Sequence, residues 1–338
     1  EEHLVEAASF IRDPRGRCYL HVTLSEEHIQ IVKARIREVK EKYEDRFQVR
    51  VKVDHSVQSP STNIIAVNED LTPFRNGEGR LVFRPGGHGA LLQNLSALDA
   101  DFIFVKNIDN IVPDNLLKKI LPYKKMLGGL ALSLQQTVFA MLRKLEKTGV
   151  AAETIDASAQ FCRESLNLVF APGFERMTPA QKKKKLISVL NRPLRVCGMV
   201  RNEGEPRGGP FWVDEKDGTQ TLQIVESAHV NMNDSGQQAV WRRAAYFNPV
   251  DMVCCIKNHS GGRFDLKKFV DPEGYLISSK TDKGRRLLAQ ELPGLWNGSM
   301  ARWNTVFVEL PIAAFNPVKT VYDLLRPQHT AGRKKRVK

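Results

Sequence analysis

The stretch FRPGGHGALLQNL, residues 83–95, places three glycines around a histidine where a strand-like run gives way to a helical one. A second stretch, DADFIFVKNIDNIVPD at 99–114, closes an apolar run with Asn-x-Asp-Asn. Glycines add no apolar surface, and Asn and Asp prefer water, so a hydrophobic core requires neither arrangement. Both stretches therefore indicate loops that are shaped for a ligand.

Strand-like and helical runs alternate around these two stretches. Residues 17–25 and 48–56 alternate in polarity as strands do, and 101–109 has the apolar run of a buried strand. Residues 26–47 and 115–148 have helical periodicity. This alternation predicts an α/β fold with a mixed, mostly parallel sheet flanked by helices. Ligands of such sheets bind at the carboxyl ends of strands, which is where both loops fall.

The second half of the chain is richer in β structure. Strands are expected at 193–202, 209–227, 244–258 and 304–312. One helix is expected near the end, at 318–325. A helical stretch near 178–191 is the candidate boundary between the halves. We therefore divide the chain into halves at 1–177 and 178–330, followed by a basic tail at 331–338.

Composition excludes several classes of protein. The 338 residues are 42% hydrophobic and 26% charged, as in ordinary soluble globular proteins. No stretch approaches the roughly 18 apolar residues of a membrane span, and no signal peptide is evident. The five cysteines form no CxxC pair, which fits a reducing compartment. We therefore expect a cytoplasmic protein with no membrane partner.

The net charge of +13 comes largely from the run Lys182–Lys185 and the basic tail. A lysine run of this kind is typical of a solvated helix face. The tail lacks the interleaved aromatic residues on which single-stranded nucleic acid stacks. No nucleic-acid partner is therefore expected.

The glycine loop favours an anion or an electron-rich base edge. Gly86, Gly87 and Gly89 permit positive φ and close approach to the backbone, and the following helix directs unpaired N–H groups at the loop. The loop matches neither the P-loop nor the dinucleotide GxGxxG pattern. A tight strand-to-helix turn without a ligand remains the alternative.

The segment KNIDN offers a carboxylate at a strand end. Magnesium is commonly held by one or two carboxylates with substrate phosphates and waters, so Asp109 alone is sufficient. The alternative is that Asp109 and Asn110 are turn and cap residues ahead of the next helix. The proximity of the glycine loop favours the metal site.

These stretches, with three later ones, resemble the motifs of UDP-sugar pyrophosphorylases in the nucleotide-diphospho-sugar transferase superfamily. The chain is more closely similar to a bacterial family of unknown function that shares this fold. RPGGHGAL and NIDN resemble the first two motifs. Three later segments resemble the remaining motifs of the family, namely DGTQTLQIVESAHV (217–230), FNPVD (247–251) and FNPVKTVYDLL (315–325). All five occur in the family's order, so the ordered set is fairly specific.

The resemblance implies a role for each motif. The glycine loop would lie against the uridine base, and Asp109 would bind the catalytic magnesium. The candidate residues are therefore catalytic Asp109 and Lys319, nucleotide-binding Gly86, Gly87, His88, Gly89 and Asn107, and sugar-binding Glu226 and Asn248, with Mg2+ as the cofactor. The chain departs from the family in two places. It contains no glycine-rich phosphate loop ending in Arg, which we expect upstream of residue 1, and Ser227 follows Glu226 without a tyrosine.

The segment ELPGLWNGSMARWNT, 291–305, is a further candidate. Trp296 and Trp303, beside amides such as Asn304, have the composition of a sugar platform, which makes Asn304 a third sugar-binding candidate. Two core tryptophans that flank a loop are the alternative. His21 and His229 lie in strand-like runs and are expected to be structural.

The resemblance implies a nucleotidyltransferase. Such an enzyme would transfer a nucleotidyl group from a nucleoside triphosphate, expected to be UTP, to a sugar 1-phosphate in the presence of Mg2+. Residues 1–177 would form the nucleotide-binding half and 178–330 the sugar-binding half. Two alternatives remain open, namely a glycosyltransferase of related fold and a non-catalytic nucleotide-sugar binding protein.

Overall fold

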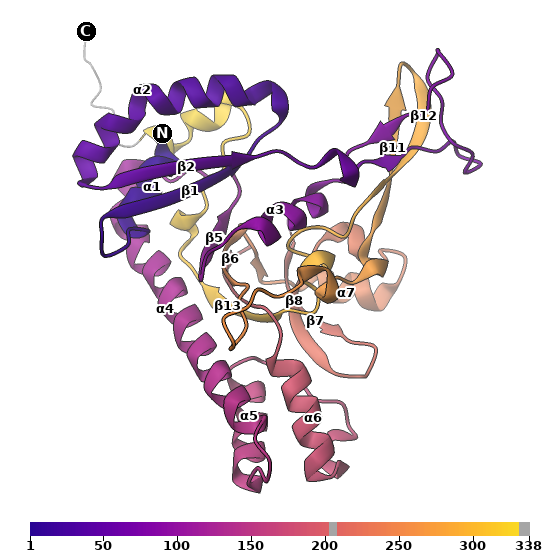
Figure 1. Ribbon diagram of the computed structural model, residues 1–338. Helices are drawn as coiled ribbons and strands as arrows, with labels where there is room; N and C mark the ends of the chain where they lie inside the picture. The colour runs from indigo at the N-terminus through magenta and orange to yellow at the C-terminus, as the bar shows by residue number, and fades with distance from the viewer. Residues whose placement is uncertain (203–207, 331–338) are drawn as a thin grey trace.

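The structure is a computed structural model that describes residues 1–202 and 208–330 (Figure 1). The helices are α1 (Glu2–Phe10), α2 (Ile29–Phe47), α3 (Leu92–Ala97), α4 (Asp114–Leu145), α5 (Ala152–Glu164), α6 (Pro179–Leu190), α7 (Ser235–Arg242) and α8 (Pro327–Thr330). The strands are β1 (Arg17–Thr23), β2 (Arg50–Ser56), β3 (Ile64–Ile65), β4 (Phe83–Arg84), β5 (Ile103–Lys106), β6 (Leu194–Arg201), β7 (Gly209–Asp214), β8 (Gln220–Val225), β9 (Tyr246–Phe247), β10 (Asp251–Cys255), β11 (Leu276–Asp282), β12 (Arg285–Glu291) and β13 (Asn304–Glu309). The expected basic tail, 331–338, lies outside the described residues.

A mixed sheet forms the centre of the molecule. Its strand order is β13-β6-β10-β5, and β9 pairs with the end of β6. Strands β13 and β6 are parallel, whereas β10 is antiparallel to both β6 and β5. Strands β5, β6 and β13 therefore run in one direction, and β10 lies between β5 and β6 in the other. The fold is α/β as expected, but the expectation of a mostly parallel sheet is not confirmed, because a strand from far along the chain inserts in the opposite direction.

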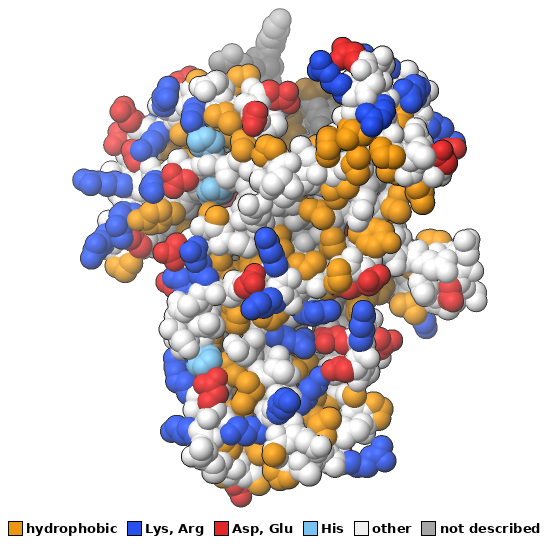
Figure 2. Space-filling model, turned by 45° about the vertical axis from the view of Figure 1, so that its right-hand side comes forward, with side chains coloured by type: hydrophobic (Ala, Val, Ile, Leu, Met, Phe, Trp, Pro, Cys, Tyr) orange, Lys and Arg blue, Asp and Glu red, His pale blue; other side chains and the backbone are white. Residues whose placement is uncertain are grey.

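The remaining described strands form small two-stranded sheets. Strands β1 and β2 are parallel, and β7–β8 and β11–β12 are antiparallel hairpins. The β11–β12 hairpin lies beside the β3–β4 segment and forms the arm at the upper right of Figure 1, joined by the bridge Val67↔Leu288. Figure 2 shows apolar side chains along the base of this arm and Lys and Arg side chains around its tip.

Helix α4 covers one face of the central sheet and contacts β6 and β10. Its apolar residues recur at helical spacing, and the buried ones include Leu117, Ile120, Leu127, Ala131 and Leu134. Helices α5 and α6 pack against its far end and against each other (Figure 1). This layer makes the sheet a rigid support for the loops at its edges.

Local sequence patterns predicted most of these elements. The expected strands at 17–25 and 48–56 are β1 and β2, and the helices at 26–47 and 115–148 are α2 and α4 with small shifts at their ends. Residues 318–325 differ from the expectation, because they form only a 3-10 helix, Val321–Leu325. None of the described helices is long and apolar enough to cross a membrane.

All five cysteines are buried and unpaired. Burial raises the pKa of Cys18 and Cys197 to about 11 and that of Cys162 and Cys255 to about 12, and it also raises the pKa of Cys254. Because the thiolate is the reactive form, we expect no rapid reaction of the native protein with Ellman's reagent at pH 8 and five reactive thiols in denaturant. A Ser260→Cys variant, at an exposed turn, should add one fast thiol. Rapid labelling of the native wild-type protein would contradict this burial.

Candidate functional site

The central sheet brings several predicted loops to one edge. Strands β5, β6 and β13 all end there, and antiparallel β10 begins there, because Asp251 pairs with Lys106. Asn107 and Asp109 follow β5, and Asn248 precedes β10. The backbone N–H of Asn107 donates to the Val250 carbonyl at 3.4 Å. The loop that carries Asp109 is thus held beside the loop that carries Asn248.

Asp109 and Lys319 also come together at this edge. The backbones of Asn110 and Pro317 form an isolated antiparallel bridge, and the Val318 N–H donates to the Asp109 carbonyl at 2.8 Å. Lys319 is exposed directly after this contact. The two predicted catalytic residues, about 200 positions apart in the chain, are therefore held by one pair of bonded backbone segments.

Asn110 holds this pair of segments together. Its side chain is buried, with Nδ2 donating to the Ala314 carbonyl at 3.1 Å and Oδ1 accepting from the Asn316 N–H at 2.9 Å. The final asparagine of Asn-x-Asp-Asn thus has a structural role and uses its side chain within the protein. Asp109, which is half-buried, keeps its carboxylate available to a ligand.

A buried group of four charges lies beneath the Asp109 loop. The Lys124 ammonium of α4 contacts Asp251 and also Glu6 at 3.1 Å, and Glu6 in turn pairs with Lys106. Burial lowers the pKa of Lys106, and the neighbouring Lys124 lowers it further. Lys124 contacts two carboxylates, which outweigh the effect of burial and raise its pKa. We call these residues, Glu6, Lys106, Lys124 and Asp251, the buried ion network.

The ion network fixes the loop through helix α1. Glu6 of α1 contacts Lys106, the last residue of β5, and His3 of the same helix bonds the Ile108 carbonyl at 2.8 Å. Sequence reasoning missed this network, although one signal was present. Lys124 occupies a position of the α4 apolar stripe, where a charge requires a buried partner.

The predicted magnesium at this edge would be bound partly by a substrate. Among the described residues no group of three or more His, Cys, Asp or Glu side chains has the geometry of a metal site. A protein cage for a metal is therefore not found there, and Asp109 is the carboxylate in the predicted motif. Magnesium that keeps waters and substrate phosphates as its other ligands needs only one carboxylate from the protein.

The glycine loop lies against the segment after β12. A Cβ on Gly89 would lie 2.1 Å from the Pro293 carbonyl oxygen, and one on Gly86 would lie 2.6 Å from the Thr62 carbonyl oxygen. Gly87 has a φ of +70° and faces the Glu291 side chain. Close approach at these glycines is therefore required by the protein's own backbone, whether or not a nucleotide also contacts them.

His88 is held in place by the same segment. Its Nδ1 accepts from the Leu295 N–H at 3.0 Å, and its ring stacks on Trp296 with centroids 4.2 Å apart. The Trp296 Nε1–H donates to the Glu226 carboxylate at 2.9 Å. The predicted nucleotide residue His88 and the predicted sugar residue Glu226 thus contact the same indole, His88 at its face and Glu226 at its N–H.

The fold connects this cluster to the Asp109 edge. The Asn248 N–H donates to the Gly208 carbonyl at 2.8 Å, and a Cβ on Gly208 would lie 2.6 Å from Cγ of Glu226. Asn248 itself is buried, with its amide donating to the Gly198 carbonyl at 2.6 Å and accepting from the Val250 N–H at 2.9 Å. The backbone around Asn248 therefore links the two clusters, and its role as a sugar contact stays a prediction.

Asn304 is placed differently from the other candidates. It is the first residue of β13, paired with Leu194 at the start of β6, and so lies at the sheet edge opposite Lys319. Its buried Nδ2 donates to the Val189 carbonyl at 3.0 Å. The structure gives this side chain a packing role, and it does not bring Asn304 to the Asp109 edge.

Arg195 of β6 is a second residue that the sequence did not reveal. Its guanidinium is fully buried and donates to Thr305 Oγ1 at 2.9 Å, to the Trp296 carbonyl at 2.7 Å and to Gln223 Oε1 at 2.8 Å. Burial lowers its pKa, and no carboxylate of the described residues forms an ion pair with it. Arg195 thus holds the backbone of Trp296 in place through its carbonyl oxygen.

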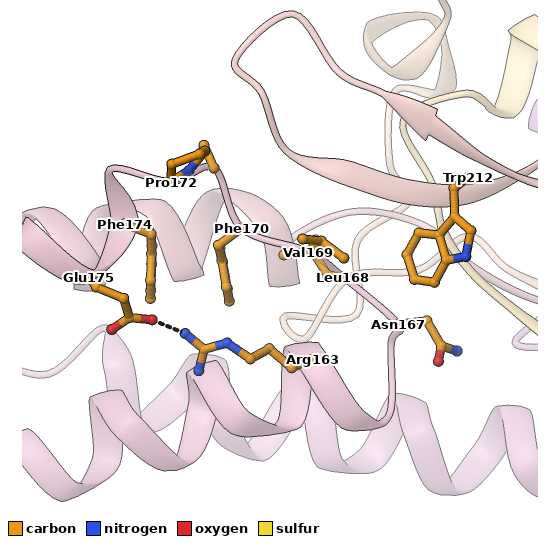
Figure 3. Close-up of a pocket in the computed structure, with 10 residues that line it drawn as sticks. Arg163, Asn167, Leu168, Val169, Phe170, Pro172, Phe174, Glu175 and Trp212 are labelled. Carbon is orange, nitrogen blue, oxygen red and sulfur yellow. Dashed lines mark hydrogen bonds and ion pairs between the residues drawn. The ribbon is translucent and has the colours of Figure 1, made fainter. Parts of the chain in front are cut away.

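A separate pocket of about 320 Å³ opens between α5, the segment after it and β7 (Figure 3). Phe170 and Phe174 stack with centroids 3.9 Å apart, and the Arg163 guanidinium lies against both rings and pairs with Glu175. Trp212 stands at the other end of the pocket and is 52% exposed. None of the lining residues is a predicted site residue, so this pocket is distinct from the candidate site.

The chain matches the family described as "Domain of unknown function (DUF4301)" over residues 1–330, and it belongs to that family. No curated protein matches the chain. The description of this family names no activity.

Several solved structures are similar to this fold. A UDP-glucose pyrophosphorylase mutant from Leishmania major, in complex with UDP-glucose, has a TM-score of 0.45 at 16% identity over 91% of this chain and 54% of that one. The UDP-N-acetylglucosamine pyrophosphorylase from Trypanosoma brucei, in complex with an inhibitor, has a TM-score of 0.46 at 15% identity over 89% and 50%. A putative UDP-N-acetylglucosamine pyrophosphorylase from Entamoeba histolytica has a TM-score of 0.42 at 11% identity over 90% and 62%. The chain spans about half the length of the first two.

Proposed function

We propose that the chain is the core of a sugar-1-phosphate nucleotidyltransferase. One observation carries the proposal, namely that the fold gathers the motifs which resemble base-, sugar-, metal- and phosphate-contacting segments. Asp109 and Lys319 meet through the Asn110↔Pro317 bridge, and Glu226 is connected to the same edge through the Gly208 carbonyl. Lys319 is exposed and Asp109 is half-buried, so solvent reaches both residues.

In the proposed reaction, an oxygen of the sugar 1-phosphate attacks the α-phosphorus of a nucleoside triphosphate, expected to be UTP. A new P–O bond forms, the bond to the β-phosphate breaks, and pyrophosphate leaves. Alignment of two anions and compensation of their charge supply most of the catalysis in such a transfer. The protein needs no nucleophile of its own.

The described residues divide these tasks between the two clusters. Lys319 would neutralise the phosphate of the sugar, Asn107 would contact the nucleotide, and Asp109 would hold Mg2+, which would supply charge compensation to the phosphates when bound. His88 and Glu226, with Glu291 nearby, suit the uncharged parts of the ligands.

Asp109→Asn tests this proposal. It removes one negative charge and keeps the size of the side chain, so we expect at least about a 100-fold loss of Mg2+-dependent turnover with an unchanged unfolding temperature. The assay measures pyrophosphate release from UTP and glucose 1-phosphate, and from other triphosphates and sugar 1-phosphates, by the full-length protein.

Asp101→Asn is the matched control, because Asp101 is exposed at the other end of the same segment and pairs with Lys257. Its turnover should equal that of the wild type. Equal turnover in Asp109→Asn would remove Asp109 from the mechanism, and no turnover by the wild type with any substrate pair would remove the transferase activity itself.

A further inference from the structure

Two side chains beside Glu226 have polar atoms that are shielded from solvent and lack a partner. Both ring nitrogens of His229 make no hydrogen bond within the described part of the chain. Asn297, which is 5% exposed, uses its Nδ2 to donate to the Ile224 carbonyl at 3.0 Å and leaves its Oδ1 unpaired. Buried polar groups normally have hydrogen-bond partners, and an unpaired one is costly. A bound ligand would provide them.

Asn297 and His88 meet at Gly294. The position of a Cβ on Gly294 would be 2.7 Å from Asn297 Oδ1, 2.7 Å from His88 Cε1 and 3.1 Å from His88 Nε2. Glycine at residue 294 therefore lets the Asn297 amide oxygen and the His88 ring edge pack closely against this part of the backbone. The unpaired Asn297 oxygen and the His88 edge thus both lie against Gly294.

The hydrogen bond to Leu295 sets the tautomer of His88. A backbone N–H can only donate, so Nδ1 accepts, and the neutral ring carries its proton on Nε2. Burial lowers the pKa of His88, which keeps the ring neutral near pH 7. The side that faces Gly294 thus offers an Nε2–H donor next to the Asn297 Oδ1 acceptor.

His229 belongs to the same group. It ends the 3-10 turn Ser227–His229 that follows Glu226, and its N–H donates to the Glu226 carbonyl at 2.9 Å. The Glu226 carboxylate accepts from the indole N–H of Trp296, on which His88 stacks, so this turn is joined to the His88 cluster through Glu226. The sequence predicted a structural histidine in a strand, whereas the structure places it in a turn with both nitrogens unused.

The chemistry of this cluster suits hydroxyl groups better than phosphate. The Glu226 carboxylate, which accepts from the Trp296 indole, would repel a phosphate, whereas Glu291 is paired with Lys280 at 3.0 Å. The cluster combines a donor at His88, acceptors at Asn297 and Glu226, and a His229 ring that can do either. A hydroxyl both donates and accepts, so a polyhydroxylated ring matches the set.

We propose that His229 and Asn297, with Glu226 and His88, bind the hydroxyl groups of the sugar in a nucleotide sugar. This inference rests on the proposed function and specifies the part of the substrate that the cluster recognises. His229 is then a specificity residue, because its ring nitrogens would pair only when a sugar hydroxyl is present.

Calorimetric titration of the full-length protein tests the inference, with UDP, UDP-glucose, UDP-galactose and UDP-N-acetylglucosamine as probes. We expect the wild type to bind at least one UDP-sugar more tightly than UDP. His229→Phe, which keeps a ring of similar shape, should lose about 10- to 100-fold in affinity for that sugar nucleotide and leave the affinity for UDP unchanged. A merely structural role would weaken both ligands together.

Further variants keep the result interpretable. His229→Gln retains a donor and an acceptor and should recover part of the affinity, and His229→Leu replaces His229→Phe if that variant does not fold. His21→Phe, in β1 and bonded to Ser56, is the control that should match the wild type.

Full affinity for the sugar nucleotide in His229→Phe, or in His229→Leu where Phe fails to fold, would overturn the inference. Equal wild-type affinity for UDP and all three UDP-sugars would overturn it and leave nucleotide binding standing, whereas no binding of any probe would overturn the proposed function as well.

Discussion

Replacement of Lys124 by methionine is expected to lower the free energy of unfolding by about 3–5 kcal/mol, because it leaves two buried carboxylates without their shared cation. Lys124, Glu6 and Asp251 have side chains that are 3%, 8% and 2% exposed, so water cannot replace the lost ammonium group. Lys106 then remains as the one cation of the network. Urea unfolding followed by circular dichroism measures the change.

Lys125→Met is the matched control for this prediction. Lys125 is the next residue of α4 and is exposed, and the exchange of Lys for Met changes helix propensity little. Its free energy of unfolding should stay within about 0.5 kcal/mol of the wild type. If Lys124→Met were no less stable than Lys125→Met, the ion network would make no net contribution to the free energy of unfolding.

The double variant Glu6→Gln/Lys124→Met should recover part of the lost stability. It removes one unpaired carboxylate and leaves Lys106 and Asp251, which lie at paired positions of β5 and β10, as opposite charges. Residues in one ion network show coupled effects, so the double variant should be more stable than the sum of the single changes predicts.

The same network predicts how stability depends on pH. Burial would raise the pKa of Glu6, but Lys124 and Lys106 outweigh it and hold the pKa below its ordinary value. Glu6 therefore stabilises the native state at neutral pH, and this contribution is lost as the pH falls through its folded pKa. In Lys124→Met only Lys106 remains to oppose the effect of burial, which raises the pKa of Glu6. The stability difference between the wild type and Lys124→Met should therefore narrow as the pH is lowered below 4.5, the ordinary pKa of a Glu side chain, and a constant difference would contradict this account.

Periodicity predicted local elements well and strand direction poorly. The patterns at 17–25, 26–47 and 48–56 depend on neighbours within one helix or strand, and β1, α2 and β2 follow them. The direction of β10 depends on pairing with β5 through Asp251 and Lys106, which are separated by more than a hundred residues. No local pattern records such a pairing, so the mostly parallel sheet was predicted from the alternation of elements alone.

The candidate site was predictable only where a motif is contiguous. The glycine loop and KNIDN stand out in the sequence because the residues of each motif are adjacent. In the structure KNIDN follows β5 at the edge of the central sheet, and the glycine loop packs against residues 291–295. The partners that hold them, Trp296 for His88 and Glu6 for Lys106, come from remote segments. The sequence could show that a histidine lies among glycines, but not which side of its ring the backbone would occupy.

Gly89→Ala is expected to disrupt the site as a whole. The added Cβ would lie 2.1 Å from the Pro293 carbonyl oxygen and 2.9 Å from that of Leu292, and both are backbone atoms that no change of rotamer can move. The loop and the segment at 291–295 must therefore separate, which costs about 1–3 kcal/mol or more of stability. The bond from the Leu295 N–H to His88 and the stacking of His88 on Trp296 depend on this contact. Ligand binding should be lost with them.

Gly77→Ala provides the control, because Gly77 lies in the turn of the arm and a Cβ there would meet nothing within 4 Å. Urea unfolding and calorimetric titration with UDP and UDP-sugars should leave Gly77→Ala close to the wild type and show Gly89→Ala to be less stable and unable to bind. A Gly89→Ala variant that kept full stability but lost binding would place a ligand, rather than residues 292 and 293, against Gly89. Retention of both properties would show that the contact between the loop and 291–295 is not required, and His88 would then need another source of its fixed orientation.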